Sequence, residues 1–194
     1  TLTPDGRRGL SGGDRSTRAD NSELDSADFI TIGTIGPPGQ RVFHIQAKQA
    51  DVLVTLIIEK FQASAIAHSI DTLLDEVQKE YQIITPDVDS SGQDFDLLEP
   101  ILPVFRVGQI GIGYDAEADR VYLVLNELLP EDAPGTPRTA RFGGSREQMR
   151  ALARHTNDVV AQGRPICGNC GQPIDPDGHF CPKSNGHRKP VAWA

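Results

Sequence analysis

The chain has 194 residues, which is enough for one core of ordinary size with a small appendage but too few for two large domains. Hydrophobic residues make up 38% and charged residues 24%, as in a soluble globular protein, and 19 glycines and 14 prolines indicate long loops. The net charge of −8 argues against a general nucleic-acid binder, and no apolar run approaches the roughly 20 residues that span a bilayer, so we expect a cytoplasmic protein without membrane contact.

The first 28 residues are rich in Gly, Ser, Asp and Arg and show no hydrophobic periodicity. Such a segment cannot bury enough apolar surface to offset the entropy lost on ordering, so residues 1–28 are predicted to be a disordered tail. The ordered core is then expected to begin at Phe29.

From Phe29 the pattern changes to short apolar and β-branched runs separated by turns. Residues 29–35, 40–47 and 52–59 are predicted strands, with a Gly-Pro-Pro-Gly turn between the first two. The connections are far too short for parallel crossovers, so these strands are expected to form an antiparallel meander.

Apolar residues from Ile66 to Tyr81 recur at helical spacing and predict a helix over about 61–80 that packs on the sheet. An acidic loop follows. Residues 104–114 and 120–127 then alternate as a second hairpin, and residues 138–142 are expected to form a short edge strand.

The second helix is the best-marked element of the chain. Ser145 and Gln148 form a capping box at its start, and Gly163 and Pro165 are stop signals. Residues 29–163 are therefore predicted to be an α+β core, in which an antiparallel sheet (meander plus second hairpin) packs with two helices. Residues 164–194 are expected to form a separate, small C-terminal zinc ribbon.

All three cysteines of the chain lie in this appendage, as Cys167 and Cys170 in C-x₂-C spacing and then Cys181. Thiolates at this spacing joined by an imidazole favour a tetrahedral Zn²⁺. We expect His187 to be the fourth ligand, with His179 as the alternative. Four protein ligands leave no position for water, so the predicted zinc is structural. A redox pair is disfavoured because the glycines and prolines prevent the helix that a redox C-x₂-C normally opens.

Two groups of basic residues are candidates for partner contacts. The arginines 146, 150 and 154 line one side of the second helix and could contact phosphate or an acidic partner, although a solvated face is the more usual meaning. Basic residues in the appendage give weak support to a nucleic-acid contact. The candidate residues are Arg146, Arg150, Arg154, Lys183, Arg188 and Lys189.

The sequence contains no enzyme signature. Its histidines outside the appendage, His44, His68 and His155, lie on different elements, and no nucleophile motif such as G-x-S-x-G occurs. The glycines at 108, 111 and 113 lack the order of a phosphate loop, and we expect them to make room for a neighbouring backbone. No catalytic residue is predicted.

Several runs of this sequence resemble the bacterial family named domain of unknown function 3090, over about residues 28–187. The family has no established activity. The resemblance implies that the gene lies near genes for a histidine-phosphatase-like protein and a kinase-like protein. It hence implies a shared phosphate-related pathway. The long N-terminal tail departs from the family. The runs that carry the resemblance are 28–33, 36–41, 73–76, 163–167, 173–179, 181–182 and 185–187.

Together these patterns favour a non-enzymatic adaptor whose zinc ribbon and sheet domain bind a protein partner. The closed metal site and the lack of a nucleophile support this hypothesis. The alternative is an enzyme or small-ligand-binding protein with a pocket on the core, using Arg141, Arg146 or His155. Nucleic-acid binding through the basic ribbon is the third hypothesis.

Overall fold

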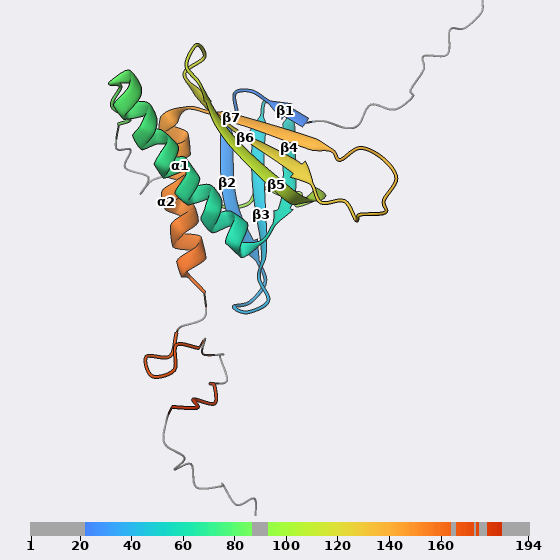
Figure 1. The fold of residues 1–194 in the computed structure, drawn as a ribbon. Coiled ribbons are helices and arrows are strands. Elements are labelled where there is room, and N and C mark those ends of the chain that lie inside the picture. Colours follow the sequence, from blue (N-terminus) through green and yellow to red (C-terminus); the bar gives the residue numbers. More distant parts are fainter. Residues whose placement is uncertain (1–21, 87–92, 164–165, 173, 175–177, 184–194) are drawn as a thin grey trace, which may run out of the picture.

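The computed structural model describes residues 22–86, 93–163, 166–172, 174 and 178–183. Within these residues it contains a seven-stranded sheet and two helices, which confirms the predicted α+β class (Figure 1). No helix in the described ranges is long and apolar enough to cross a membrane. The elements are β1 Ser22–Leu24, β2 Phe29–Ile35, β3 Val42–Gln49, β4 Val52–Ile58, α1 Lys60–Tyr81, β5 Pro103–Asp115, β6 Arg120–Glu127, β7 Thr139–Gly144 and α2 Arg146–Ala161.

The sheet has the strand order β1-β7-β6-β5-β4-β3-β2. Strands β2, β3 and β4 form the expected antiparallel meander, and β5, β6 and β7 form a second antiparallel unit. The two units are joined by a parallel pairing of β4 with β5. This pairing is possible because α1 and the segment after it supply the long crossover that parallel neighbours need.

Strand β1 lies inside the segment that was expected to be a disordered tail, so this boundary was wrong. Ser22–Leu24 pairs in parallel with β7, and the Ala27 N–H donates to the Gly143 carbonyl at 2.8 Å. Leu24 and Ala27 are buried in the core. A three-residue strand is too short to show periodicity, which explains the error, and β1 covers the side of β7 that was predicted to be a free edge. Residues 1–21 lie outside the described residues.

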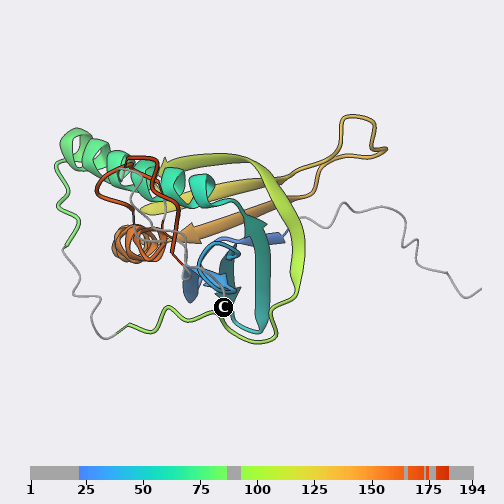
Figure 2. The same cartoon turned by 90° about the horizontal axis from the view of Figure 1, so that it is seen from below.

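The apolar face of the meander forms the centre of the core. Ile32, Ile45 and Leu56 are neighbours across β2, β3 and β4, and each is 0% exposed. Both helices lie along one side of the sheet (Figure 2), where α2 packs on β2 and α1 packs on β5 and on α2. The helical residues that enter the core include Ile66, Ile70, Leu74, Met149 and Leu152.

The opposite face of the meander carries polar side chains and is crossed by the segment after α1. Gln46 is fully buried there, and its Nε2 donates to Thr55 Oγ1 and to the Leu98 carbonyl, both at 2.9 Å. The Leu98 N–H donates back to Gln46 Oε1 at 2.8 Å. One buried amide therefore holds the connection to β5 against the sheet.

Strand β5 has a bulge at Gly108, where its register against β6 shifts after Val107. A Cβ atom at Gly108 would lie 3.0 Å from the Leu128 Cα, so this glycine makes room for a neighbouring backbone, as expected. A Cβ atom at Gly111 would meet only ordinary contacts, 3.8 Å from Val124 Cβ, and Gly113 has no neighbour within 4 Å, so the expectation is not met at these two positions. Gln62 of α1 donates through Nε2 to the carbonyls of Val107 and Gly108, both at 3.1 Å, and ties the helix to the bulge.

Arg146, the first residue of α2, points into the structure, which corrects its assignment as a partner contact. Its guanidinium donates to both carboxylate oxygens of Asp119, at 2.7 and 3.1 Å, and to Ile84 and Thr85. The Arg146 hydrogen bonds, and then that of the Tyr114 hydroxyl, hold the pKa of Asp119 below its ordinary value. A buried guanidinium needs such a partner, so the residue fixes the β5–β6 turn to α2 instead of facing solvent.

Replacing Asp119 by Asn should lower the free energy of unfolding by about 1–2 kcal/mol at neutral pH, because the buried Arg146 loses its charged acceptor. Asp119 has a φ of 49°, which asparagine also adopts, so backbone strain should not contribute. Glu117→Gln in the same turn is the control and should change stability by less than about 0.5 kcal/mol. Urea denaturation of both variants measures the difference.

The same pair predicts a pH dependence. Because the folded-state pKa of Asp119 is depressed below 3.8, the stability that this carboxylate contributes is present above the unfolded value and is lost as pH falls through the folded value. The stability difference between the wild type and Asp119→Asn should therefore shrink below that pH. A difference that persists unchanged in strong acid would contradict the assignment.

Removing residues 164–194 should leave a folded core. The capping box at Ser145 and the whole of α2 precede this segment, and the last member of the core cluster among the described residues is Val159. The shortened chain should unfold cooperatively on heating, within a few degrees of the full chain, as followed by circular dichroism. Loss of the cooperative transition would show that the C-terminal segment is part of the core.

Candidate metal centre

The C-terminal segment lies beyond the end of α2 (Figure 1). Its first part is a tight loop, in which the Gly171 N–H donates to the Cys167 carbonyl at 2.9 Å and the Cys167 N–H donates to the Gln172 carbonyl at 2.8 Å. Gly171 has a φ of 74°, a left-handed conformation that favours glycine. This local turn brings Cys167 and Cys170 together, as the C-x₂-C spacing predicts.

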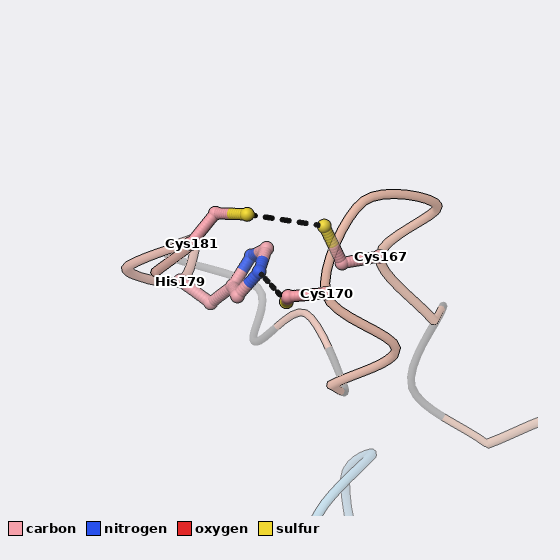
Figure 3. Close-up of side chains that lie close together, drawn as sticks. All are labelled: Cys167, Cys170, His179 and Cys181. Atoms are coloured by element: carbon pink, nitrogen blue, oxygen red, sulfur yellow. Dashed lines mark hydrogen bonds between the residues drawn. The ribbon is translucent and has the colours of Figure 1, made fainter. Parts of the chain in front are cut away.

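Four side chains converge in this segment (Figure 3): Cys167, Cys170, His179 and Cys181. One donor atom from each lies within 4.8 Å of the others. The Sγ atoms of Cys167 and Cys181 are 3.8 Å apart, and Cys170 Sγ is 3.3 Å from His179 Nε2. The cysteines are free, and 3.8 Å is far beyond the roughly 2.05 Å of a disulfide. The arrangement fits a bound metal ion.

The protonation of the thiols supports this use. The backbone N–H groups of Cys170 and then Asn169 lower the pKa of Cys167 to about 6, so its thiolate dominates at neutral pH. The Gln172 N–H lowers the pKa of Cys170, but burial and the neighbouring cysteines outweigh it, and the net shift is upward. A metal ion would displace that proton, because a coordinating thiol is deprotonated.

The sequence favoured His187 as the fourth ligand, whereas the described structure places His179 beside the cysteines. His187, the predicted ligand, lies outside the described residues, and that prediction stays untested. His179, the alternative, is brought into contact with the cysteines, since only one residue separates it from Cys181. Among the described residues the metal set is therefore three cysteines and His179.

The remaining arginines of the predicted row turn toward α1. Arg150 Nη2 lies 3.6 Å from Asp75 Oδ1. Burial raises the pKa of Asp71, and the positive charges of Arg150 and Arg154 oppose that rise. These side chains complement the acidic face of α1. In the appendage, Lys183 is exposed, whereas Arg188 and Lys189 lie outside the described residues.

The residues proposed for an alternative catalytic pocket do not meet at one place. His155 Nε2 lies 3.0 Å from the Ile32 carbonyl, its ring stacks on Phe95, and burial lowers its pKa. Arg141 donates to Asp25 and lies 3.8 Å over the Tyr122 ring. In the part of the chain that the structure describes, each has a separate structural role.

Sequence reasoning missed two apolar residues beside the metal ligands. Ile166 precedes Cys167 and is 62% exposed, and Phe180 stands between His179 and Cys181 and is 86% exposed. The sequence did not predict their exposure, because an apolar residue in a short loop can be either buried or exposed. Only the folded segment reveals that both point into solvent.

Comparison with protein-family models matches residues 22–181 to the family described as protein of unknown function (DUF3090). No curated protein and no solved structure matches the chain. The matched range includes β1, the whole core and all four residues of the candidate metal centre.

The purified protein should contain one metal ion per chain, since the three cysteines can form only one thiolate-rich set. Cys181→Ser and His179→Ala should each weaken metal binding by about tenfold or more, whereas His187→Ala should leave it within about threefold. Elemental analysis combined with competition against a chromogenic chelator measures this. Full occupancy in Cys181→Ser would refute the ligand set, and the reverse behaviour of the two histidines would make His187 the ligand.

Proposed function

The chain belongs to the DUF3090 family of proteins of unknown function, and from this premise we propose that it is a non-enzymatic adaptor. Its C-terminal segment, stabilised by Zn²⁺, contacts a protein partner. The core supports this segment and gives the molecule its stability. Free thiols of this kind persist in a reducing compartment, which fits a cytoplasmic location.

The donor geometry supports zinc as the metal. In a tetrahedron with Zn–S bonds of about 2.3 Å and Zn–N bonds of about 2.0–2.1 Å, the S–S edge is about 3.8 Å and the S–N edge about 3.6 Å. One S–S distance here, between Cys167 and Cys181, is 3.8 Å, one S–N distance, between Cys170 and His179, is 3.3 Å, and all four donor atoms lie within 4.8 Å of one another. Three thiolates and one imidazole also match the ligand preferences of this ion.

A zinc ion with four protein ligands would be structural. No coordination position stays open for water or substrate, so the ion supplies rigidity and folding energy. The segment needs this contribution, because two of its described apolar side chains, Ile166 and Phe180, are exposed, and the third, Ile174, is only half-buried.

These exposed side chains are the observation that carries the proposal. Ile166 is bonded to one ligand residue, and Phe180 is bonded to two. Metal binding would therefore hold the backbone of both and reduce the entropy lost when a partner covers them. Exposed apolar residues on a rigid element are typical of the central anchors of protein interfaces.

A protein partner is favoured over nucleic acid. The net charge of the chain is −8, whereas nucleic-acid contacts need clustered Lys and Arg. The kinase-like and phosphatase-like proteins implied by the family resemblance are the first partners to test.

The test replaces the two anchors and compares them with matched residues elsewhere. Ile166→Ser combined with Phe180→Ser should weaken partner capture by about 30-fold or more, the scale of a strong interface anchor. The control is Ile84→Ser with Leu102→Ser, because these residues of the core are 75% and 71% exposed. The control should stay within about threefold of the wild type. Quantitative pull-down from native lysate, followed by affinity measurement with the purified partner, gives both values.

Cys181→Ser should reduce capture like the anchor variant, because the segment loses its metal ligand set. Equal capture by the anchor and control variants would refute the proposed surface. Nuclease-sensitive capture of nucleic acid, lost on reversing the charges of Lys183, Arg188 and Lys189, would support the basic ribbon instead.

A further inference from the structure

A cavity of about 450 Å³ opens at the end of the core where α1 begins and α2 ends. Its wall comes from the turn before β3, the end of β4, the first residue of α1, β5 and the residues that close α2. The volume lies in the range of pockets that bind small organic ligands. All the described residues that line the cavity belong to the core, and none of them is a residue of the candidate metal centre.

Three cationic side chains line this cavity: Arg41, Lys60 and Arg106. Among the described residues that line it, Glu59 is the single carboxylate, and it forms an ion pair with Arg106. Among the described residues, Arg41 and Lys60 form no ion pair. The cavity therefore has two uncompensated positive charges on a chain whose net charge is −8. Such a local reversal of charge favours an anionic ligand.

The Lys60 ammonium lies beside the end of α2. A Cβ atom built at Gly163 would lie 2.9 Å from Lys60 Nζ, so the glycine leaves the space that the ammonium occupies. Lys60 is also the first residue of α1, and the first intrahelical bond runs from the Ala63 N–H to the Glu59 carbonyl. The N–H groups of Lys60 and Phe61 add positive potential at the same wall, whereas the Gln62 N–H is bound by the Glu59 side chain in a capping box.

The rest of the cavity is apolar. Phe43 and Ile58 are buried in the core beneath it, and Val42 and Val160 contribute aliphatic surface. A cationic wall over an apolar floor suits a ligand that combines a charged group with a carbon body. A free inorganic ion would use only the charged half of this surface.

We propose that this cavity binds a small organic phosphate monoester. At neutral to alkaline pH the phosphate group carries nearly two negative charges, which match Arg41 and Lys60. Two of its oxygen atoms can accept the paired N–H groups of one arginine guanidinium. A carboxylate would leave one cation unneutralised. The apolar body of the ligand would lie against Val42 and Val160, above the buried Phe43 and Ile58.

The experiment uses the full chain, labelled with ¹⁵N, and titrates it with phenyl phosphate at pH 8. Saturable binding with a dissociation constant of about 1 mM is expected for a ligand of this size. The amide chemical-shift changes should be largest at Gly39, Lys60 and Gly163. Lys60→Gln and Arg41→Gln should each weaken binding by about tenfold. Lys79→Gln, at the far end of α1, is the matched control and should not.

Glu59→Gln should strengthen phenyl phosphate binding, whereas the two cation variants weaken it. It removes the only carboxylate among the described lining residues and releases Arg106, so phenyl phosphate should bind about tenfold more tightly, provided that cooperative unfolding shows an intact fold. Weaker binding in this folded variant would overturn the electrostatic basis of the proposal. Binding of benzoate as tight as that of phenyl phosphate would overturn the choice of a dianion, and binding of inorganic phosphate as tight would overturn the apolar floor.

A last variant separates this inference from the proposed function. Cys181→Ser should bind phenyl phosphate like the wild type, because no described residue of the C-terminal segment lines the cavity. Failure of partner capture together with retained phosphate binding would leave this site standing. Shift changes confined to residues outside the cavity, or equal binding by Lys60→Gln and Lys79→Gln, would refute it.

Discussion

The parallel pairing of β4 with β5 is the constraint on which the architecture depends. It joins the meander and the second hairpin into one sheet, and it can form only if the chain between the strands is long enough to cross over. Two buried glutamines support that crossing. Gln62 binds α1 to the bulge in β5, and Gln46 holds the returning segment on the polar face of the meander. Each satisfies backbone groups that a bulge or an irregular segment would otherwise leave unpaired.

The same crossover creates the cationic cavity. Lys60 stands where β4 passes into α1, and Arg106 stands in the part of β5 that pairs with β4, so the strand pairing itself brings their charges to one wall. The candidate metal centre has a different origin. Its four residues lie within fifteen positions of the sequence, and a local turn brings Cys167 and Cys170 together. The protein thus combines a site built by long-range topology with one built by local geometry, and the two can be disturbed separately.

The difference explains which functional features could be foreseen. C-x₂-C spacing is a local pattern, and the three cysteines meet as predicted because a tight turn needs only its own residues. Arg146 shows the opposite case. Its spacing from Arg150 and Arg154 suggested an outward row, but Asp119 approaches from a turn distant in sequence and takes its guanidinium into the fold. Arg41 and Lys60 gave no signal, since single basic residues at a turn and at a helix start are ordinary surface choices.

The sequence by itself determined the α+β class, the positions of both helices, the meander and hairpin, and the clustering of the cysteines. Hydrophobic periodicity, capping residues and short spacings encode these features, and all of them depend on neighbours along the chain. Only the tertiary structure decided that β1 belongs to the sheet, that Arg146 is internal, and that three basic residues face one cavity. The physical reason is that each of these depends on which distant segments pack together, and burial and charge pairing are properties of that packing.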